Sequence, residues 1–87
     1  MWYVYIVRTR DDWLYVGETS DLSRRVEKHN DGSASSFTAP RRPVTLVYWE
    51  QQPDRMAALK RERQLKRWRR AKNEALIAGE LELLRRL

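Results

Sequence analysis

The sequence contains no cysteine and only one histidine, His29. Without thiols the chain can form neither disulfides nor a thiolate metal site, and a lone imidazole cannot build a multi-histidine metal centre. The N-terminus lacks a basic segment followed by an apolar run, and no stretch approaches the ~20 apolar residues that span a bilayer. We therefore expect a soluble, cytoplasmic protein without a signal peptide or a membrane contact.

Positive charge is concentrated in one part of the chain. The net charge is +6, yet residues 55–72 alone hold nine Lys or Arg against one acid, Glu62. This stretch carries +8 and leaves −2 for the remainder. A localised basic stretch favours a polyanionic partner, with nucleic acid first, and a solvated helix face is the alternative.

Eighty-seven residues predict one small domain, 1–87, with a core at 2–78 and an apolar helical tail at 79–87. Ser20 is the expected N-cap of the first helix, with Asp21 in its first turn. The order β-β-α-β-α-α predicts an α+β fold, a three-stranded antiparallel sheet flanked by helices. The expected strands are 2–8, 13–17 and 44–49, the expected helices are 21–29, 54–68 and 71–78, and residues 32–43 are expected to form a loop.

Arg25 and His29 share one face of the first expected helix with Leu22 and Val26. The two apolar residues should point inward, so Arg25 should lean toward the edge of the core. A partly desolvated arginine needs an anion, either a protein carboxylate or a substrate phosphate. His29 is either a hydrogen-bonded, half-buried residue or a proton carrier with a near-neutral pKa.

Glu62 is the only acid of the basic stretch, and on a helical wheel it lies between Ala58 and Leu59, beside Leu65. A carboxylate on this apolar-leaning face should be paired, hydrogen-bonded or metal-bound. One interpretation is an ion pair with Arg25 or a neighbouring arginine. The other is a ligand for Mg²⁺, which is often held by one or two carboxylates together with waters and phosphate oxygens.

Three tyrosines lie on the first two expected strands, with Tyr3 and Tyr5 on one strand face and Tyr15 just before Gly17. Strand tyrosines are usually packing residues. A phenol can also act as a general base where a nearby cation lowers its pKa of about 10.

The order and spacing of these residues resemble the GIY-YIG nuclease superfamily over roughly residues 2–78. Tyr3-Val4-Tyr5 stands at the first signature, usually Gly-Ile-Tyr, and Tyr15-Val16-Gly17 at the second, Tyr-Ile-Gly. The helix with Arg25 looks like the family's helix with its essential arginine. Residues 41–48 and 58–66 are similar to the small stand-alone bacterial members, in which an acid before a Leu/Ile-Lys pair is the metal ligand.

The resemblance implies an endonuclease that depends on a divalent metal and hydrolyses phosphodiester bonds in DNA. It implies that Tyr15 activates or holds the attacking water and that Tyr5 positions water or phosphate. Arg25 would stabilise charge on the phosphate, and Glu62 would bind one Mg²⁺ or Mn²⁺ ion. His29 stands where this group often has histidine and would assist proton transfer.

Two positions depart from the family pattern. Tyr3 replaces the glycine of the first signature, as is common in the small branch. Glu18 follows Gly17, where repair-type relatives tend to carry lysine, so a cation near Tyr15 is missing and the activation of the phenol is open. Glu18 is alternatively a second acid near the site.

The expected partner is DNA, bound with low sequence specificity or with a preference for branched or nicked structure, because phosphate contacts carry no sequence information. RNA is an alternative substrate, and a non-catalytic nucleic-acid-binding module of the same fold is the alternative function. The apolar tail could instead contact a protein partner or a second copy of the chain. The residues expected to contact the DNA backbone are Arg41, Arg42, Lys60, Arg61, Arg63, Lys66 and Arg67.

Overall fold

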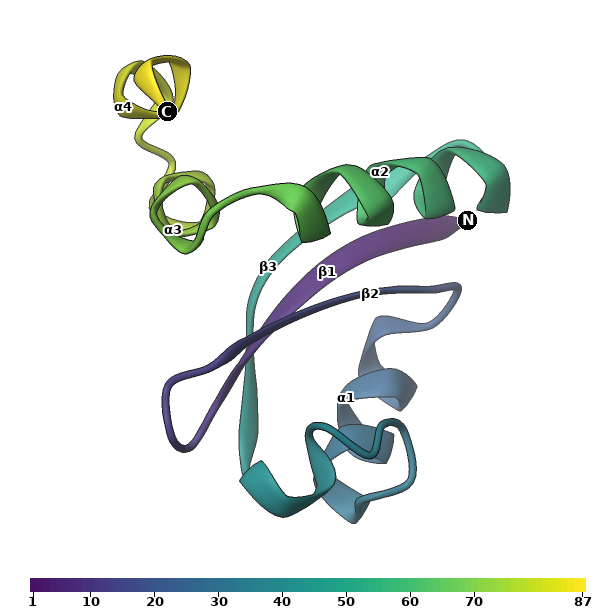
Figure 1. Cartoon of the computed structure of the whole chain (residues 1–87). Coiled ribbons are helices and arrows are strands. Elements are labelled where there is room, and N and C mark those ends of the chain that lie inside the picture. The colour runs from purple at the N-terminus through teal and green to yellow at the C-terminus, as the bar shows by residue number, and fades with distance from the viewer.

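The computed structural model describes residues 1–87 and contains one antiparallel sheet of three strands in the order β2-β1-β3 (Figure 1). The strands are β1 (Trp2–Thr9), β2 (Leu14–Thr19) and β3 (Val44–Gln52). β1 is the central strand, and its residues 4–7 are at most 1% exposed. The predicted α+β fold with a three-stranded antiparallel sheet is confirmed.

Helices cover both faces of the sheet. In Figure 1, α2 (Arg55–Arg67) crosses one face, while α1 (Leu22–Asp31) and the loop with the short helix η1 (Ala39–Arg41) lie on the other side. Beyond α2 the chain continues through α3 (Arg70–Ala78) into α4 (Leu81–Arg86). None of these helices has the length and apolar character required to cross a membrane.

The alternation of side chains along β1 divides the core into two parts. Val4 and Ile6 face α2 and pack with Leu65 in one apolar cluster. Tyr5 and Val7 point to the opposite face and belong to a second cluster. Because successive strand residues point to opposite faces, this alternation places the Tyr5 phenol on the α1 side of the sheet.

The first helix begins one residue later than expected. Asp21, not Ser20, is the N-cap of α1, and its side chain accepts a hydrogen bond from the Arg24 backbone N–H at 3.1 Å. The Thr19 hydroxyl accepts a bond from the Asp21 N–H at 3.1 Å. This bond holds Asp21 in an extended conformation, which suits a cap, so the prediction of Ser20 was wrong.

Two strands are longer than their sequence patterns suggest. β2 continues past Gly17 to Thr19, and β3 continues to Gln52, because both pair with β1 along nearly its whole length. The expected helical tail forms α4, where Leu81 is 65% exposed and Leu87 is 47% exposed. These tail leucines therefore contribute little to the core.

Candidate active site

A buried hydrogen-bonded chain starts at the Tyr5 hydroxyl. It lies 2.8 Å from His29 Nε2, and His29 Nδ1 lies 2.8 Å from Thr38 Oγ1. Tyr5 is 1% exposed, and His29 and Thr38 are fully buried. Three elements therefore meet here, since the three residues come from β1, α1 and the loop before η1.

The protonation states of Tyr5 and His29 determine which group donates in each of these hydrogen bonds. Burial raises the pKa of Tyr5, so the phenol keeps its proton and donates to His29 Nε2. Burial, and then the charge of Arg25, lowers the pKa of His29, so the imidazole is neutral. Its single proton then lies on Nδ1 and is donated to Thr38, whose hydroxyl donates to the Ser35 carbonyl at 3.5 Å.

Gly17 makes room for the Tyr5 ring. The two residues are paired across β1 and β2, and a Cβ added at Gly17 would lie 2.6 Å from Tyr5 Cζ. Real Cβ atoms essentially never come so close to another heavy atom, so glycine at this position allows the phenol to lie against the neighbouring strand. The glycine of the second signature is thus explained by close packing.

Arg25 lies beside this buried chain without a carboxylate partner. It is half-buried, and no Asp or Glu oxygen lies within 4.0 Å of its guanidinium. Burial dominates the raised pKa of Tyr5, and the charge and hydrogen bonding of Arg25 oppose that rise. Arg25 also lines a hollow of about 190 Å³ together with Lys28. The alternative of a structural ion pair for Arg25 is therefore wrong.

Glu62 reaches the same region from α2. Its Oε2 lies 2.8 Å from Lys66 Nζ, and this ammonium lies 5.7 Å from the centroid of the Tyr15 ring. An ion pair with an arginine was one of the two alternatives for Glu62; the ion pair that forms is with the lysine one turn later. Burial is the main cause of the raised pKa of Tyr5, and the Tyr15 and Glu62 groups raise it further. Both groups therefore lie close enough to act on that phenol.

The structure thus brings together all five residues that the sequence singled out. The ring centroids of Tyr15 and His29 are 5.2 Å apart, and the Tyr5 hydroxyl is hydrogen-bonded to His29. Burial raises the pKa of Tyr5 and the charge of Arg25 opposes this rise, so Arg25 lies near the same phenol. Tyr5 and His29 are closed off from solvent, whereas the other three are half-buried. Tyr15, Arg25 and Glu62 are therefore the members that a substrate can reach.

Glu62 could hold a metal ion only with help from outside the chain. No group of three or more acidic or histidine side chains lies together in residues 1–87. Glu18 alternates with Tyr15 and Gly17 along β2, its Oε1 lies 4.0 Å from Arg55, and its buried Oε2 has no hydrogen-bond partner. A single hard carboxylate still fits Mg²⁺, which keeps several waters and takes substrate phosphate oxygens as further ligands.

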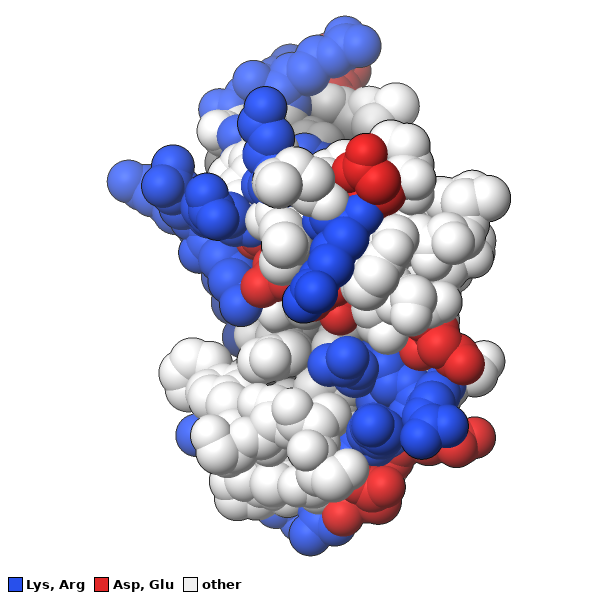
Figure 2. Space-filling view, turned by 90° about the vertical axis from the view of Figure 1, so that its right-hand side faces the viewer, with Lys and Arg blue, Asp and Glu red and all other residues white.

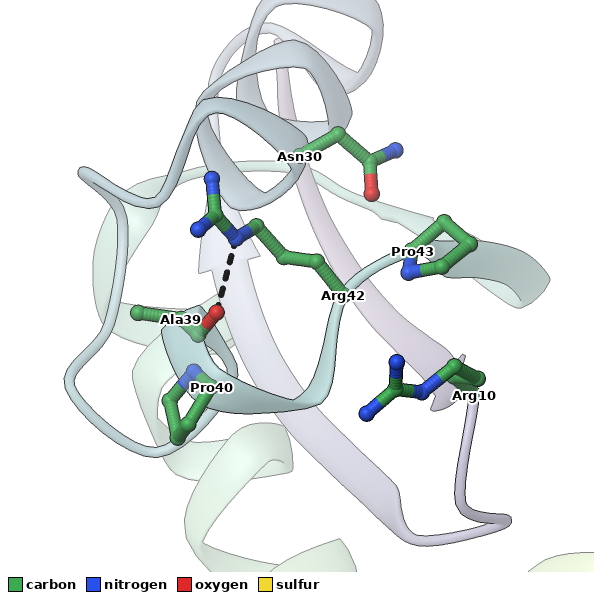
Figure 3. Close-up of a pocket in the computed structure, with 6 residues that line it drawn as sticks. All are labelled: Arg10, Asn30, Ala39, Pro40, Arg42 and Pro43. Atoms are coloured by element: carbon green, nitrogen blue, oxygen red, sulfur yellow. Dashed lines mark hydrogen bonds between the residues drawn. The ribbon is translucent and has the colours of Figure 1, made fainter.

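Three of the expected DNA contacts are held by the protein itself. Arg41 donates to the Phe37 carbonyl at 2.8 Å, and Arg61 donates to Glu50 at 3.0 Å. Arg42 donates to the Ala39 carbonyl at 2.7 Å and lines a pocket of about 420 Å³ beside η1 (Figure 3). These three arginines are less free to contact DNA phosphates than their positive charge alone suggests.

The exposed face of α2 carries the basic residues that have no ion pair. Lys60, Arg63 and Arg67 are exposed and line a hollow of about 470 Å³ with Trp68. Figure 2 shows Lys and Arg side chains in the upper part of the molecule, where α2, α3 and α4 lie, and a second group of them on the right of the lower part. Unpaired cations on one helix face can bind a polyanion without first breaking internal contacts.

Sequence reasoning missed two members of the group. Thr38 lies in a hydroxyl-rich loop, and nothing in its spacing marks it as the partner of His29. Lys66 was expected only to contact DNA, although its position four residues after Glu62 was a signal for the ion pair that forms.

Comparisons with known proteins agree with this arrangement. A family model described as the GIY-YIG catalytic domain matches residues 1–75. A UPF0213 protein of Staphylococcus saprophyticus is 43% identical over 76 residues, which cover 87% of this chain and 93% of that protein. A UPF0213 protein of Staphylococcus aureus is 47% identical over 75 residues, which cover 86% and 92%.

A solved structure shares the fold. The solution NMR structure of a UPF0213 protein from Bacillus halodurans is similar with a TM-score of 0.58 and 35% sequence identity. The match covers 90% of this chain and 84% of that one. The likeness thus extends over nearly the whole of both chains.

Proposed function

The chain belongs to the GIY-YIG family of nuclease-type domains, and on that basis we propose that it is an endonuclease that hydrolyses phosphodiester bonds in DNA with the help of one divalent metal ion. We further propose that residues 1–87 act as one unit, with the catalytic core at 2–78 and the helical tail at 79–87.

One observation carries this proposal. Arg25 is half-buried, lacks a carboxylate partner and lies in a group with two tyrosines and one glutamate. A desolvated guanidinium without an internal anion favours an anion from outside. A phosphate is negatively charged, and two of its oxygens can accept the two parallel N–H bonds of a guanidinium.

The accessible residues divide the work of phosphodiester hydrolysis. Tyr15 holds and activates the attacking water, and Arg25 stabilises the extra negative charge as the phosphorus becomes five-coordinate. Lys66 supplies a cation over the Tyr15 ring, in a sequence that has Glu18 where repair-type relatives have lysine. The buried Tyr5 and His29 position these groups, since their hydrogen bond joins the sheet to α1.

Glu62 is the residue that would hold Mg²⁺ or Mn²⁺. When bound, such an ion neutralises charge on the leaving oxygen. Lys66 contacts only Oε2 of this carboxylate, at 2.8 Å, so Oε1 would remain available to the ion. The Lys66 ammonium lies next to the Tyr15 ring, where it can contact the substrate phosphate.

Binding of DNA relies on the basic residues of α2 and the loop before β3. Their contacts are with phosphates, so we expect low sequence specificity or a preference for branched or nicked DNA. Lys60, Arg63 and Arg67 are exposed, have no ion pair and supply most of the affinity, whereas the exposed Lys66 is paired with Glu62. Arg41, Arg42 and Arg61 contribute less, because protein carbonyls or carboxylates already hold them.

The test compares Glu62→Gln with Glu27→Gln, a matched change at an exposed acid of α1 that has no ion pair. Plain, nicked and branched DNA are incubated with each protein in Mg²⁺ or Mn²⁺, and the products are separated by size. Glu62→Gln should lower cleavage by about 10²–10³-fold while DNA binding persists, and Glu27→Gln should cut normally.

The result also separates the enzyme from a non-catalytic binding module. The module is favoured by the ion pair between Glu62 and Lys66, which satisfies the carboxylate without a metal. Binding without cleavage in the wild type and both variants would support the module and overturn the enzyme. Salt dependence would not separate them, because both contact phosphates.

A further inference from the structure

A largely apolar cleft of about 470 Å³ opens directly beside Tyr15, and nothing so far gives it a role. Its size lies within the ~300–1,000 Å³ typical of small-ligand pockets. Four of its 10 lining residues are aromatic: Trp13 and Tyr15 from the hairpin, Phe37 from the loop, and Trp68 at the end of α2. Lys66 adds a cation to the same lining.

The aromatic residues on the hairpin side form an ordered platform. The rings of Tyr15 and Phe37 are stacked, with centroids 6.2 Å apart and planes 21° from parallel. Trp13 meets Phe37 edge-on at 6.1 Å, and the Arg41 guanidinium lies 4.2 Å from the Phe37 ring centroid. Arg41 also donates to the Phe37 carbonyl, so the loop is held in place.

Trp13 extends this platform into solvent. It is 52% exposed, so its ring is open to a ligand. Its backbone is fixed by two bonds with Thr9, one donated by the Thr9 N–H at 2.9 Å and one accepted by the Thr9 hydroxyl at 2.8 Å. An exposed aromatic ring on a fixed backbone next to a cleft is suited to stack against a flat ligand.

The position of the cleft identifies the ligand. It shares Tyr15 and Lys66 with the candidate active site, so a phosphodiester held there places the base of an adjoining nucleotide at the cleft. In a duplex the faces of the bases are covered by their neighbours, and only an unpaired base can offer a face to an aromatic ring. Stacking of this kind tolerates any base, which suits an enzyme without sequence specificity.

We propose that this cleft binds an unpaired nucleobase next to the scissile phosphate, so that the preferred substrate contains a single-stranded segment. The inference rests on the proposed function for the place of the phosphate. It adds a substrate class that phosphate contacts alone cannot select. Base stacking does not distinguish deoxyribose from ribose, so DNA and RNA strands are separate arms of the test.

The test measures binding in EDTA, where metal-dependent cleavage cannot occur. Fluorescence anisotropy compares labelled single strands of DNA and RNA, a duplex of the same length, and a single strand with consecutive abasic sites. Trp13→Ala is compared with Trp49→Ala, because Trp49 is 53% exposed and also meets an aromatic ring edge-on, 5.8 Å from Tyr3, but does not line the cleft.

Trp13→Ala should weaken single-strand binding at least about fivefold and leave duplex binding unchanged, while Trp49→Ala changes neither by more than twofold. The wild type should also prefer the intact strand to the abasic one at equal charge. Equal affinity for intact and abasic strands, or an equal loss on single strand and duplex, would overturn the inference. The abasic comparison needs no variant and therefore stands even if Trp13→Ala misfolds.

The outcomes also distinguish this inference from the proposed function. Metal-dependent cleavage with no preference for unpaired bases would contradict base binding in the cleft and support the proposed endonuclease. A preference for unpaired bases without cleavage would support base binding in the cleft and contradict the endonuclease.

Discussion

His29 should make the stability of this protein depend on pH near neutrality. It is the only histidine in the chain, fully buried, and bonded on both ring nitrogens to Tyr5 and Thr38. A proton added at Nε2 would turn the Tyr5 hydroxyl from donor to acceptor and would place a positive charge in a buried site near Arg25. The folded state therefore resists protonation that the unfolded chain accepts freely.

The sign follows from the direction of the pKa shift. Burial, and then Arg25, lowers the pKa of His29 below its ordinary 6.5 in the folded state. Below pH 6.5 the unfolded state binds more protons, so the free energy of unfolding falls as the pH falls. If His29 stays neutral in the folded protein, the loss between pH 7.5 and 5.5 is about 1.4 kcal/mol.

Other groups with lowered pKa values act below this window. A hydrogen bond from Arg8 lowers the pKa of Glu74, and one from Ser33 lowers that of Asp31, from ordinary values of 4.5 and 3.8. Their stabilisation is lost only in more acidic solution. For a domain of this size, 1.4 kcal/mol corresponds to a fall of roughly 5–10 °C in Tm.

The measurement is urea unfolding at several pH values between 7.5 and 5.5, for the wild type and His29→Gln. The variant should be less stable throughout, because Tyr5 and Thr38 lose part of their bonding, but its profile should be flat in this window. NMR of the single imidazole supplies a direct check. Parallel profiles for the two proteins, or an imidazole that titrates at pH 6.5 or above in the folded state, would refute the reasoning.

Three further outcomes are expected. Arg25→Ala should lower cleavage by about 10²–10³-fold with DNA binding nearly unchanged, while Arg24→Ala, at the exposed neighbour, should cut like the wild type; equal activity of both variants would remove Arg25 from the mechanism. Tyr15→Phe should keep its circular dichroism spectrum and lose about 10²–10⁴-fold in rate, and a fully active variant would mean that another group activates the water. Gly17→Ala should cost about 1–3 kcal/mol in urea unfolding, because its Cβ displaces the Tyr5 ring; an unchanged midpoint would contradict the close packing.

Much of the fold was predictable because its signals are local. Alternating bulky residues indicate the strands, and apolar residues that recur every three or four positions indicate one face of a helix. These periodicities do not define the residue at which a strand or helix begins or ends. β2 continues to Thr19 because β1 offers backbone partners there, and α1 begins after Asp21 because Thr19 bonds the cap.

The candidate site was predictable as a set of residues but not as a set of contacts. Tyr5, Tyr15, Arg25, His29 and Glu62 could be named from spacing and family resemblance, and the structure brings them together. Their partners were a different matter. An ion pair between Arg25 and Glu62 was a reasonable alternative from charge alone, yet α2 places a lysine of its own next to that carboxylate.

The sequence by itself determined the order and approximate positions of the strands and helices and how the charges are distributed, because these properties depend on neighbours within a few positions. Only the tertiary structure decided that Arg25 has no carboxylate, that Thr38 completes the bonding of His29, and that Trp13 stands over a cleft. Each of these depends on the distance between segments that are remote in the chain. Those distances are set by strand pairing and by the packing of α1 and α2 on opposite faces of the sheet.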